Sequence, residues 1–155
     1  MSRGTDRVRA AAAAAGLEIR IRRMGESTRT AEEAARQCGC DLAQIIKSLV
    51  FQGKGSGQLF LFLIPGDRRL DMDKAALVAG EEVSRADPRR VRERTGFAIG
   101  GVSPIGHLEP PLIFADKSLL DHAHVWAAAG AHDAVFRATP AALIKAAGAG
   151  MADLA

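Results

Sequence analysis

The run Leu59 to Ile64, LFLFLI, places six large apolar side chains in a row. Successive side chains of a β-strand point to opposite faces of the sheet, so a strand built from this run is apolar on both faces. Such a strand is covered on both sides. Because six residues are far fewer than the roughly 20 that a membrane helix needs, the run predicts the central strand of a covered sheet.

The segment before this strand predicts its partner. Residues Gln44 to Gln52, QIIKSLVFQ, are rich in β-forming types, and the glycines of Gly53 to Gly57 supply a turn. We therefore expect a β-hairpin that joins Gln44–Gln52 to Gln58–Ile64. Further strands are predicted over residues 17–22, where apolar and charged side chains alternate, and over 112–115, 124–128 and 134–137.

Capping residues predict short helices between the strands. Thr30, with Glu33 three residues later, forms the pattern of a capping box and opens a helix that ends at Gly39. Asp71 and Asp87 are placed to open two more helices. The remaining predicted helices cover residues 5–15 and 140–147. Because helices and hairpins are mixed without regular β-α-β alternation, we expect an α+β fold with a mixed or antiparallel sheet.

Length and composition fit one globular domain over residues 1–155, since 48% of the residues are hydrophobic and 25% are charged. The N-terminal segment is basic and then alanine-rich, but six alanines make a poor signal-peptide core, and Glu18 and Arg20 follow closely. We therefore expect a cytoplasmic protein with no membrane partner.

The positive charge is concentrated in the first part of the chain. The net charge is +3, yet residues 1–94 hold 18 Lys and Arg against 13 Asp and Glu, whereas residues 95–155 hold 3 against 5. Arginine, with 16 of the 21 basic residues, suits bidentate contact with phosphate. A genome rich in G and C would produce the same arginine excess, so the charge allows a nucleic-acid partner without requiring one.

Lys47 is the first candidate for a catalytic or binding residue. Alternation along its strand places it on one face with Ile45, Leu49 and Phe51. A lysine among these side chains loses hydration, which lowers its pKa unless its amine reaches an opening. The residues leave three roles open: a base, a cationic anchor at a pocket wall, and an edge-strand lysine that prevents aggregation.

The second candidate is a glycine-rich loop. Its residues run Gly100, Gly101, Val102, Ser103, Pro104, Ile105 and Gly106. Glycines let backbone N–H groups approach a ligand closely, and the proline stiffens the turn, as in a cradle for an oxyanion or phosphate. The spacing matches neither a P-loop nor a dinucleotide fingerprint. Ser103 precedes a proline and has no triad spacing, so we do not expect a nucleophile there.

No metal site is predicted. Cys38 and Cys40 supply two ligands where structural zinc needs four, and no cluster of carboxylates or cysteines accompanies His122 and His124. We expect ordinary thiols, and histidines at the surface or in a pocket wall. Trp126 and the six phenylalanines are too few for a nucleic-acid stacking platform and are predicted to lie in the core.

Five segments together carry a resemblance to a known family. They are STRTAEEAA at residues 27–35, QIIKSLVF with Lys47, LIPGDRRLD at 63–71, IGGVSPIG at 99–106, and the step Ala129-Gly130. In this order they resemble the YbaK/ProX family of aminoacyl-tRNA deacylases, which are relatives of the editing domain inserted in bacterial prolyl-tRNA synthetases. The resemblance spans roughly residues 17 to 154.

The resemblance implies a free-standing editing domain with a barrel-like sheet flanked by short helices. Such a domain hydrolyses the ester between a wrong amino acid and the 3′ end of a tRNA, most often tRNA charged by prolyl-tRNA synthetase. Lys47 then anchors the 3′-terminal nucleotide or the carbonyl, and residues 100–106 hold the ester together with Thr30, Ala129 and Gly130. The resemblance implies no metal, no organic cofactor and no DNA partner, and makes prolyl-tRNA synthetase a candidate partner.

Ala128 bears on the amino acid. Many relatives that act on cysteine carry a Ser two residues before the glycine that matches Gly130, so Ala128 favours Ala, Ser, Thr or another small amino acid over Cys. Two other functions remain open. One is a non-catalytic module of the same fold that binds tRNA or a synthetase, and the other is an enzyme acting on a small ester.

Overall fold

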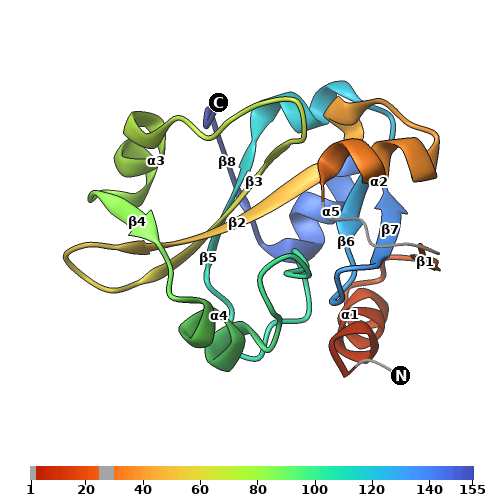
Figure 1. The fold of residues 1–155 in the computed structure, drawn as a ribbon, viewed down its shortest axis with the longest axis horizontal. Helices are drawn as coiled ribbons and strands as arrows, with labels where there is room; N and C mark the ends of the chain where they lie inside the picture. The colour runs from red at the N-terminus through yellow and green to blue at the C-terminus, as the bar shows by residue number, and fades with distance from the viewer. Residues whose placement is uncertain (1–2, 25–29) are drawn as a thin grey trace.

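The structure is a computed structural model that describes residues 3–24 and 30–155 (Figure 1). Its strands form a five-stranded sheet in the order β4-β2-β3-β5-β8 and a three-stranded sheet in the order β1-β7-β6. The strands are β1 (Ile21–Arg23), β2 (Ile46–Gly53), β3 (Leu59–Pro65), β4 (Val83–Arg85), β5 (Leu112–Asp116), β6 (Val125–Ala128), β7 (Ala134–Ala138) and β8 (Gly150–Ala152). The helices are α1 (Arg3–Ala14), α2 (Ala31–Cys38), α3 (Met72–Ala79), α4 (Pro88–Thr95) and α5 (Pro140–Ala147), with 3-10 turns η1 (Leu42–Gln44) and η2 (Lys117–Asp121).

The predicted hairpin and its central strand are confirmed. Strands β2 and β3 pair antiparallel, from Ile46 opposite Pro65 to Gln52 opposite Leu59. On its other side β3 pairs with β5 in parallel, so the sheet is mixed. Every residue of β3 is buried, as expected for a strand that is apolar on both faces.

The two faces of β3 contact different hydrophobic clusters. Leu61 and Leu63 belong to the larger cluster, which also contains residues of α1, β6, β7 and α5. Phe60 and Phe62 point the other way into a smaller cluster with Phe51 of β2. Side chains also alternate along β2. Lys47, Leu49 and Phe51 lie on the side of the smaller cluster. Ile46, Ser48 and Val50 lie on the side of the larger cluster.

The α+β class is confirmed, but the sheet is not one barrel-like sheet. Between the two sheets the described residues make a single β-bridge, from Ile45 to Trp126. Ile45 precedes β2 and packs with Ala34 and Ala35 of α2, which differs from the predicted place beside Leu49. Because this one bridge is all the β-pairing that joins the two sheets among the described residues, they meet at a corner and do not close into a barrel.

The predicted helix caps are confirmed. The Thr30 hydroxyl accepts a hydrogen bond of 3.2 Å from the Glu33 N–H, and the side chains of Asp71 and Asp87 cap α3 and α4. The Gly39 backbone is left-handed, with a φ of 67°, which ends α2 where it was expected to end. Two short edge strands, β4 and β8, were not predicted, because three residues of ordinary composition carry no periodic signal.

Candidate functional site

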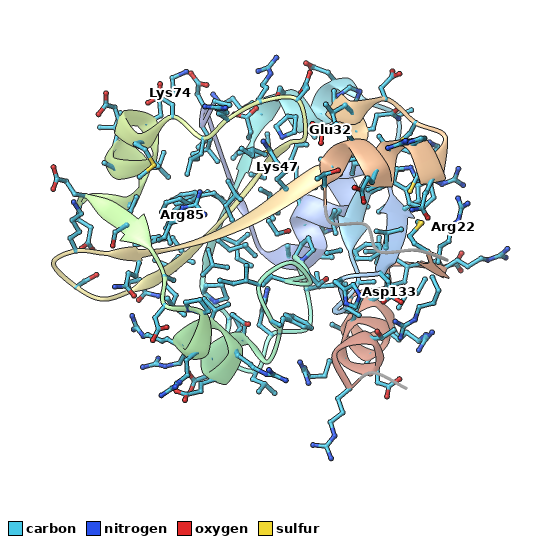
Figure 2. All side chains as sticks on the ribbon, in the orientation of Figure 1. Arg22, Glu32, Lys47, Lys74, Arg85 and Asp133 are labelled. Carbon is cyan, nitrogen blue, oxygen red and sulfur yellow. The ribbon has the colours of Figure 1, made fainter. Side chains whose placement is uncertain are left out.

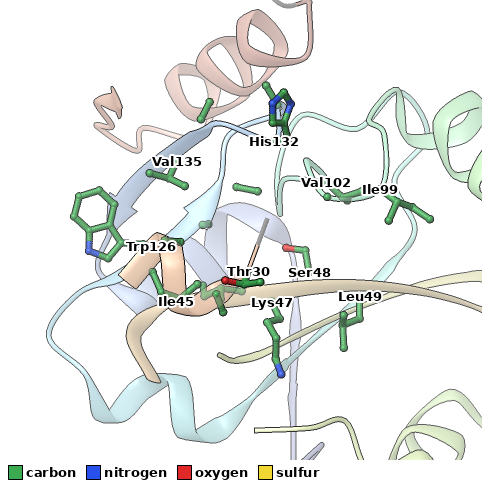
Figure 3. A pocket seen from close by; sticks show the side chains of 18 residues that line it. Thr30, Ile45, Lys47, Ser48, Leu49, Ile99, Val102, Trp126, His132 and Val135 are labelled. Carbon is green, nitrogen blue, oxygen red and sulfur yellow. The ribbon is translucent and has the colours of Figure 1, made fainter. Parts of the chain in front are cut away.

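A pocket of about 310 Å³ opens at the corner where the two sheets meet (Figure 3). Its walls come from the start of α2, from β2, from the loop before β5, and from β6 and β7 with their connection. The lining residues are Thr30, Ala31, Ala34, Ile45, Ile46, Lys47, Ser48, Leu49, Ile99, Gly100, Val102, Trp126, Ala127, Ala128, Ala131, His132, Ala134 and Val135.

Small apolar residues dominate these walls. Six of the lining residues are alanines and one is glycine, and the larger ones are mostly aliphatic. A cavity of this volume with few polar groups holds a small organic group and orients it through the polar atoms that are present. The candidates for those atoms are Ser48, His132, Lys47 and the backbone of the loop.

Ser48 is the most unusual polar group of the pocket. Its Oγ atom is buried, and no hydrogen-bond partner for it exists among the described residues. In Figure 3 the hydroxyl points to the side of β2 where Val102 and His132 lie. An unpaired buried hydroxyl costs free energy unless a ligand satisfies it, so the pocket is matched to a ligand with a polar atom at this point.

Lys47 leaves β2 on the side opposite to Ser48 (Figure 3). Lys47 is one of the lining residues, while its ammonium group donates a hydrogen bond to the carbonyl oxygen of Arg68. Figure 2 shows the side chain on the ribbon of β2, with Glu32 of α2 nearby. The ammonium group therefore lies beside the pocket rather than within it.

The electrostatic surroundings of Lys47 agree with the sequence expectation. Burial lowers the pKa of the Lys47 amine, and the carboxylates of Glu32 and Asp67 and the guanidinium of Arg69 act on it with opposite signs. With carboxylates on one side and a carbonyl acceptor already in contact, the group is arranged as a held cation.

The glycine-rich loop divides into a lining part and a buried part. Gly100 and Val102 line the pocket, and Gly101 lines an adjoining groove. Neither Gly100 nor Val102 donates a backbone hydrogen bond to another described residue, so their N–H groups are available as donors in the loop that lines the pocket. The rest of the segment turns inward: Ser103, Pro104 and Ile105 are buried, and Gly106 is half-buried.

Ser103 has a structural place in this loop. Its hydroxyl oxygen accepts a hydrogen bond of 3.3 Å from the N–H of Ile105, and its side chain has no exposed surface. Ala129 is likewise buried in the large cluster, whereas Gly130 lines the adjoining groove. Among the predicted site residues, Thr30, Lys47, Gly100 and Val102 are thus the ones that line the pocket.

Helix α1 fixes both loops that border the pocket. The guanidinium of Arg7 donates hydrogen bonds to the carbonyl oxygens of Gly96 and Gly106, and it lies 4.9 Å from the centre of the Phe97 ring. Gly4 packs so closely on Gly130 that a Cβ atom at position 4 would lie 2.4 Å from the Gly130 oxygen. No pattern in the sequence links these residues, because their contacts are between segments far apart in the chain.

His107 and His132 have different surroundings. His107 packs edge-on against Phe97, with 5.5 Å between ring centres, and its Nε2 atom is buried without a partner among the described residues. Burial lowers the pKa of His107 to about 4, although a backbone hydrogen bond with Ser103 opposes this. His132 is exposed and lines the pocket, which confirms the expectation of a histidine in a pocket wall.

Trp126 corrects the sequence prediction. It is half-buried and lines the pocket instead of lying in the core, because it projects from the outer face of the three-stranded sheet. The expected thiols are free, and burial raises the pKa of Cys38 to about 11. Ser27, Thr28 and Arg29, which contributed to the family resemblance, lie outside the described residues.

Residues 3–24 and 30–155 contain no group of three or more His, Cys, Asp and Glu side chains placed to hold a metal ion. None of their helices is both long enough and apolar enough to cross a membrane.

Known proteins resemble this chain in sequence and in fold. A solved structure described provisionally as a trans-editing enzyme for prolyl-tRNA synthetase is 45% identical, with a TM-score of 0.92 over 99% of this chain and 98% of that one. The uncharacterized protein YwhH of Bacillus subtilis is 36% identical over 74% of this chain and 72% of its own length. Proline–tRNA ligase of Thermosipho melanesiensis is 33% identical over 60% of this chain, a match to 16% of the ligase.

Residues 25–146 match the family model described as the aminoacyl-tRNA editing domain, and the chain belongs to this family. The resemblance seen in the sequence is therefore confirmed. The protein is an aminoacyl-tRNA deacylase, an enzyme of translation fidelity, and it is related to the editing domains of prolyl-tRNA synthetases.

Proposed function

We propose that this deacylase acts in trans on mischarged tRNA-Pro and removes Ala, Ser, Thr or another small amino acid. The observation that carries the proposal is the size and lining of the pocket: about 310 Å³, with six alanines and one glycine among its walls. Such a cavity admits a small side chain together with its α-amino and carbonyl groups. We rank Cys lower, because Ala128 stands where many cysteine-specific relatives carry Ser.

The reaction is the hydrolysis of an ester. Water adds to the carbonyl carbon, the bond from that carbon to the ribose oxygen breaks, and the ribose oxygen takes a proton. The step needs hydrogen-bond donors at the developing oxyanion more than it needs a side-chain nucleophile. We assign this role to the Ser48 hydroxyl and to the backbone N–H groups of Gly100 and Val102, which border one cavity.

Lys47 is proposed as a cationic anchor for the 3′ end of the tRNA. Its ammonium group lies beside the pocket and is held by the Arg68 carbonyl at an exposed position, so a phosphate oxygen at the 3′ end of the tRNA can replace that contact. A base that removes a proton from the attacking water has to lie within the cavity. Thr30 shapes the mouth as the cap of α2, and Gly101, Ser103, Pro104, Ile105, Gly106, Ala129 and Gly130 hold the loops in place.

The test compares Lys47→Ala and Lys47→Arg with the natural protein on alanyl-tRNA-Pro. An anchor predicts a large loss of deacylation for Lys47→Ala and a partial recovery for Lys47→Arg, because arginine keeps the charge. Equal rates for Lys47→Ala and the natural protein would refute the role of Lys47. Binding of tRNA without any turnover would favour the alternative of a non-catalytic module.

We place the enzyme in the cytoplasm, where charged tRNA is used, and we propose that prolyl-tRNA synthetase assists it. The pocket would take the acceptor end of the tRNA, and the anticodon lies at the opposite end of that molecule, so help from a synthetase would supply selectivity for the tRNA. Adding the synthetase to the assay should then sharpen the choice between tRNA-Pro and tRNA-Ala carrying the same amino acid.

A further inference from the structure

A second and larger groove, of about 1060 Å³, lies beside the pocket. It runs between α1 and the three-stranded sheet. The residues that line it are Arg9, Ala12, Ala13, Leu17, Glu18, Ile19, Arg20, Ile21, Arg22, Trp126 and Arg137. Four of these are arginines and one is an acid, so the groove carries positive charge.

The strand register explains why these side chains gather. Trp126 of β6 lies directly opposite Arg137 of β7, and both point away from the buried Ala127 and Phe136. On the other side of β7, Ile21 lies opposite Phe136, which places Arg20 one residue beyond the ladder and next to Arg137. The outer face of the small sheet thus brings guanidinium groups and an indole side by side.

Two of the four arginines have no partner among the described residues. Arg9 pairs with Asp6 over 3.4 Å, and Arg22, labelled in Figure 2 at the edge of the molecule, donates to the Gln37 carbonyl over 3.0 Å. Arg20 and Arg137 are exposed and make no hydrogen bond or ion pair with another described residue. Exposed guanidinium groups of neighbouring strands are suited to bidentate contacts with phosphate oxygens.

The groove and the pocket share one lining residue, Trp126, so the indole stands where they border each other. A polymer whose terminal ester occupies the pocket therefore passes the indole as it leaves and then meets Arg137 and Arg20. Aromatic rings stack on unpaired bases, and arginines track the phosphates that follow, which is the usual arrangement for a single strand that enters a duplex.

One other basic groove borders the pocket. It is half as large, about 510 Å³, and its arginines are Arg3, Arg7 and Arg92. Arg7 is already bonded to the carbonyl oxygens of Gly96 and Gly106, which leaves two. The residues that this second groove shares with the pocket are Ile99, Ala131 and His132, so its only ring for stacking at the shared border is an imidazole, which is smaller than an indole, and it fits a nucleic acid less well.

We propose that the groove of Arg20 and Arg137 binds the acceptor strand of the tRNA, with Trp126 stacked on an unpaired base next to the ester. The inference rests on the proposed function for its substrate, and it adds the surface by which the RNA is held. An acidic peptide is the competing partner for a basic groove, but it makes no use of the indole at the pocket mouth.

The test uses Arg20→Gln/Arg137→Gln, with Arg3→Gln/Arg92→Gln as the matched pair from the other groove. The first measurement is binding of an uncharged hairpin of the tRNA-Pro acceptor stem with its unpaired 3′ end. We expect Arg20→Gln/Arg137→Gln to raise Kd at least about tenfold and to make the salt slope shallower by about 2, one for each lost phosphate contact. An unchanged Kd, a loss confined to the matched pair, or equal competition by polyglutamate would overturn the proposal.

The second measurement separates this inference from the proposed function. It compares kcat/KM on alanyl-tRNA-Pro with kcat/KM on the 3′-alanyl ester of adenosine, which is too short to reach the groove. Arg20→Gln/Arg137→Gln should lose activity on the tRNA and keep it on the short ester, whereas equal loss on both would overturn the groove assignment. A protein that binds the hairpin through this groove but hydrolyses neither substrate would refute the proposed function alone.

Discussion

The guanidinium of Arg7 donates a hydrogen bond of 3.3 Å to the carbonyl oxygen of Gly106, 99 residues away in the chain. The same group donates to the carbonyl oxygen of Gly96, so one side chain of α1 holds both ends of the segment 96–106, which contains the glycine-rich loop. Arg7 precedes the residues that match the editing-domain family, 25–146. A segment outside the matched region therefore positions the loop that borders the pocket.

Replacing Arg7 by Met should loosen this loop. The variant keeps an unbranched apolar stem but loses two hydrogen bonds to the loop and the contact of the guanidinium with Phe97, which should speed exchange of the amide hydrogens in residues 98–106. Hydrogen exchange followed by mass spectrometry measures this directly. Arg89→Met, at an exposed position of α4, is the control and should leave exchange in the loop unchanged. Exchange that is as slow in Arg7→Met as in the natural protein would show that the loop keeps its conformation without the Arg7 contacts.

The contact between Gly4 and Gly130 should make Gly4→Ala destabilising. Alanine normally favours a helix over glycine by about 1 kcal/mol, but here its Cβ would lie 2.4 Å from a backbone oxygen. We expect the overpacking to lower the free energy of unfolding by about 1–3 kcal/mol, measured by urea denaturation. Gly16→Ala has open space around it and only the strain of a φ of 71°, so it should cost about 1 kcal/mol. Unchanged stability of Gly4→Ala would contradict the close approach.

His107 should make stability depend on pH. Burial lowers its pKa to about 4 in the folded protein, below the usual value of about 6.5 in the unfolded chain. Between these values the unfolded chain binds more protons, so this contribution is complete above pH 6.5 and is lost as the pH falls toward 4. The loss amounts to roughly 3 kcal/mol at most.

The variant His107→Gln isolates this effect, because glutamine stays neutral at every pH. Urea denaturation of both proteins between pH 4 and 8 gives the difference in their unfolding free energies. The carboxylates are the same in both proteins, so their contribution to the pH dependence cancels in this difference. We expect the natural protein to lose stability relative to His107→Gln as the pH is lowered through this window. A difference that does not change with pH would show that His107 is not shielded from protonation.

Ser48→Ala should separate stability from activity. Removing a buried hydroxyl that has no partner among the described residues should leave the unfolding free energy equal or raise it by about 1 kcal/mol. If the hydroxyl contacts the developing oxyanion, the same change should lower kcat on alanyl-tRNA-Pro by about 100-fold. A Ser48→Ala variant that is less stable and equally active would show that the hydroxyl stabilises the fold and takes no part in the reaction.

Local patterns predicted the framework of the fold. The apolar run of β3, the hairpin with β2 and the cap at Thr30 follow from alternation and from side-chain oxygens at helix starts, which act between near neighbours in the chain. The division into two sheets was not predictable, because it depends on the ladder ending at the bridge from Ile45 to Trp126.

The candidate site was predicted only in part. Lys47 and the glycine loop stand out by residue type, whereas Ser48 and His132 become notable only when β2, the loop and β7 meet around one cavity. A polar residue between Ile46 and Val50 on an apolar face was the one sequence signal for Ser48. Arg7 gave no such signal, because its role depends on carbonyl groups almost 100 residues away.

Deacylation of tRNA-Pro charged with labelled alanine tests the central claim most directly. The account predicts loss of the label over many turnovers per enzyme molecule, for Ala and for other small amino acids that fit a pocket of about 310 Å³. Loss of every label at the rate of spontaneous hydrolysis, across a panel of charged tRNAs, would contradict it.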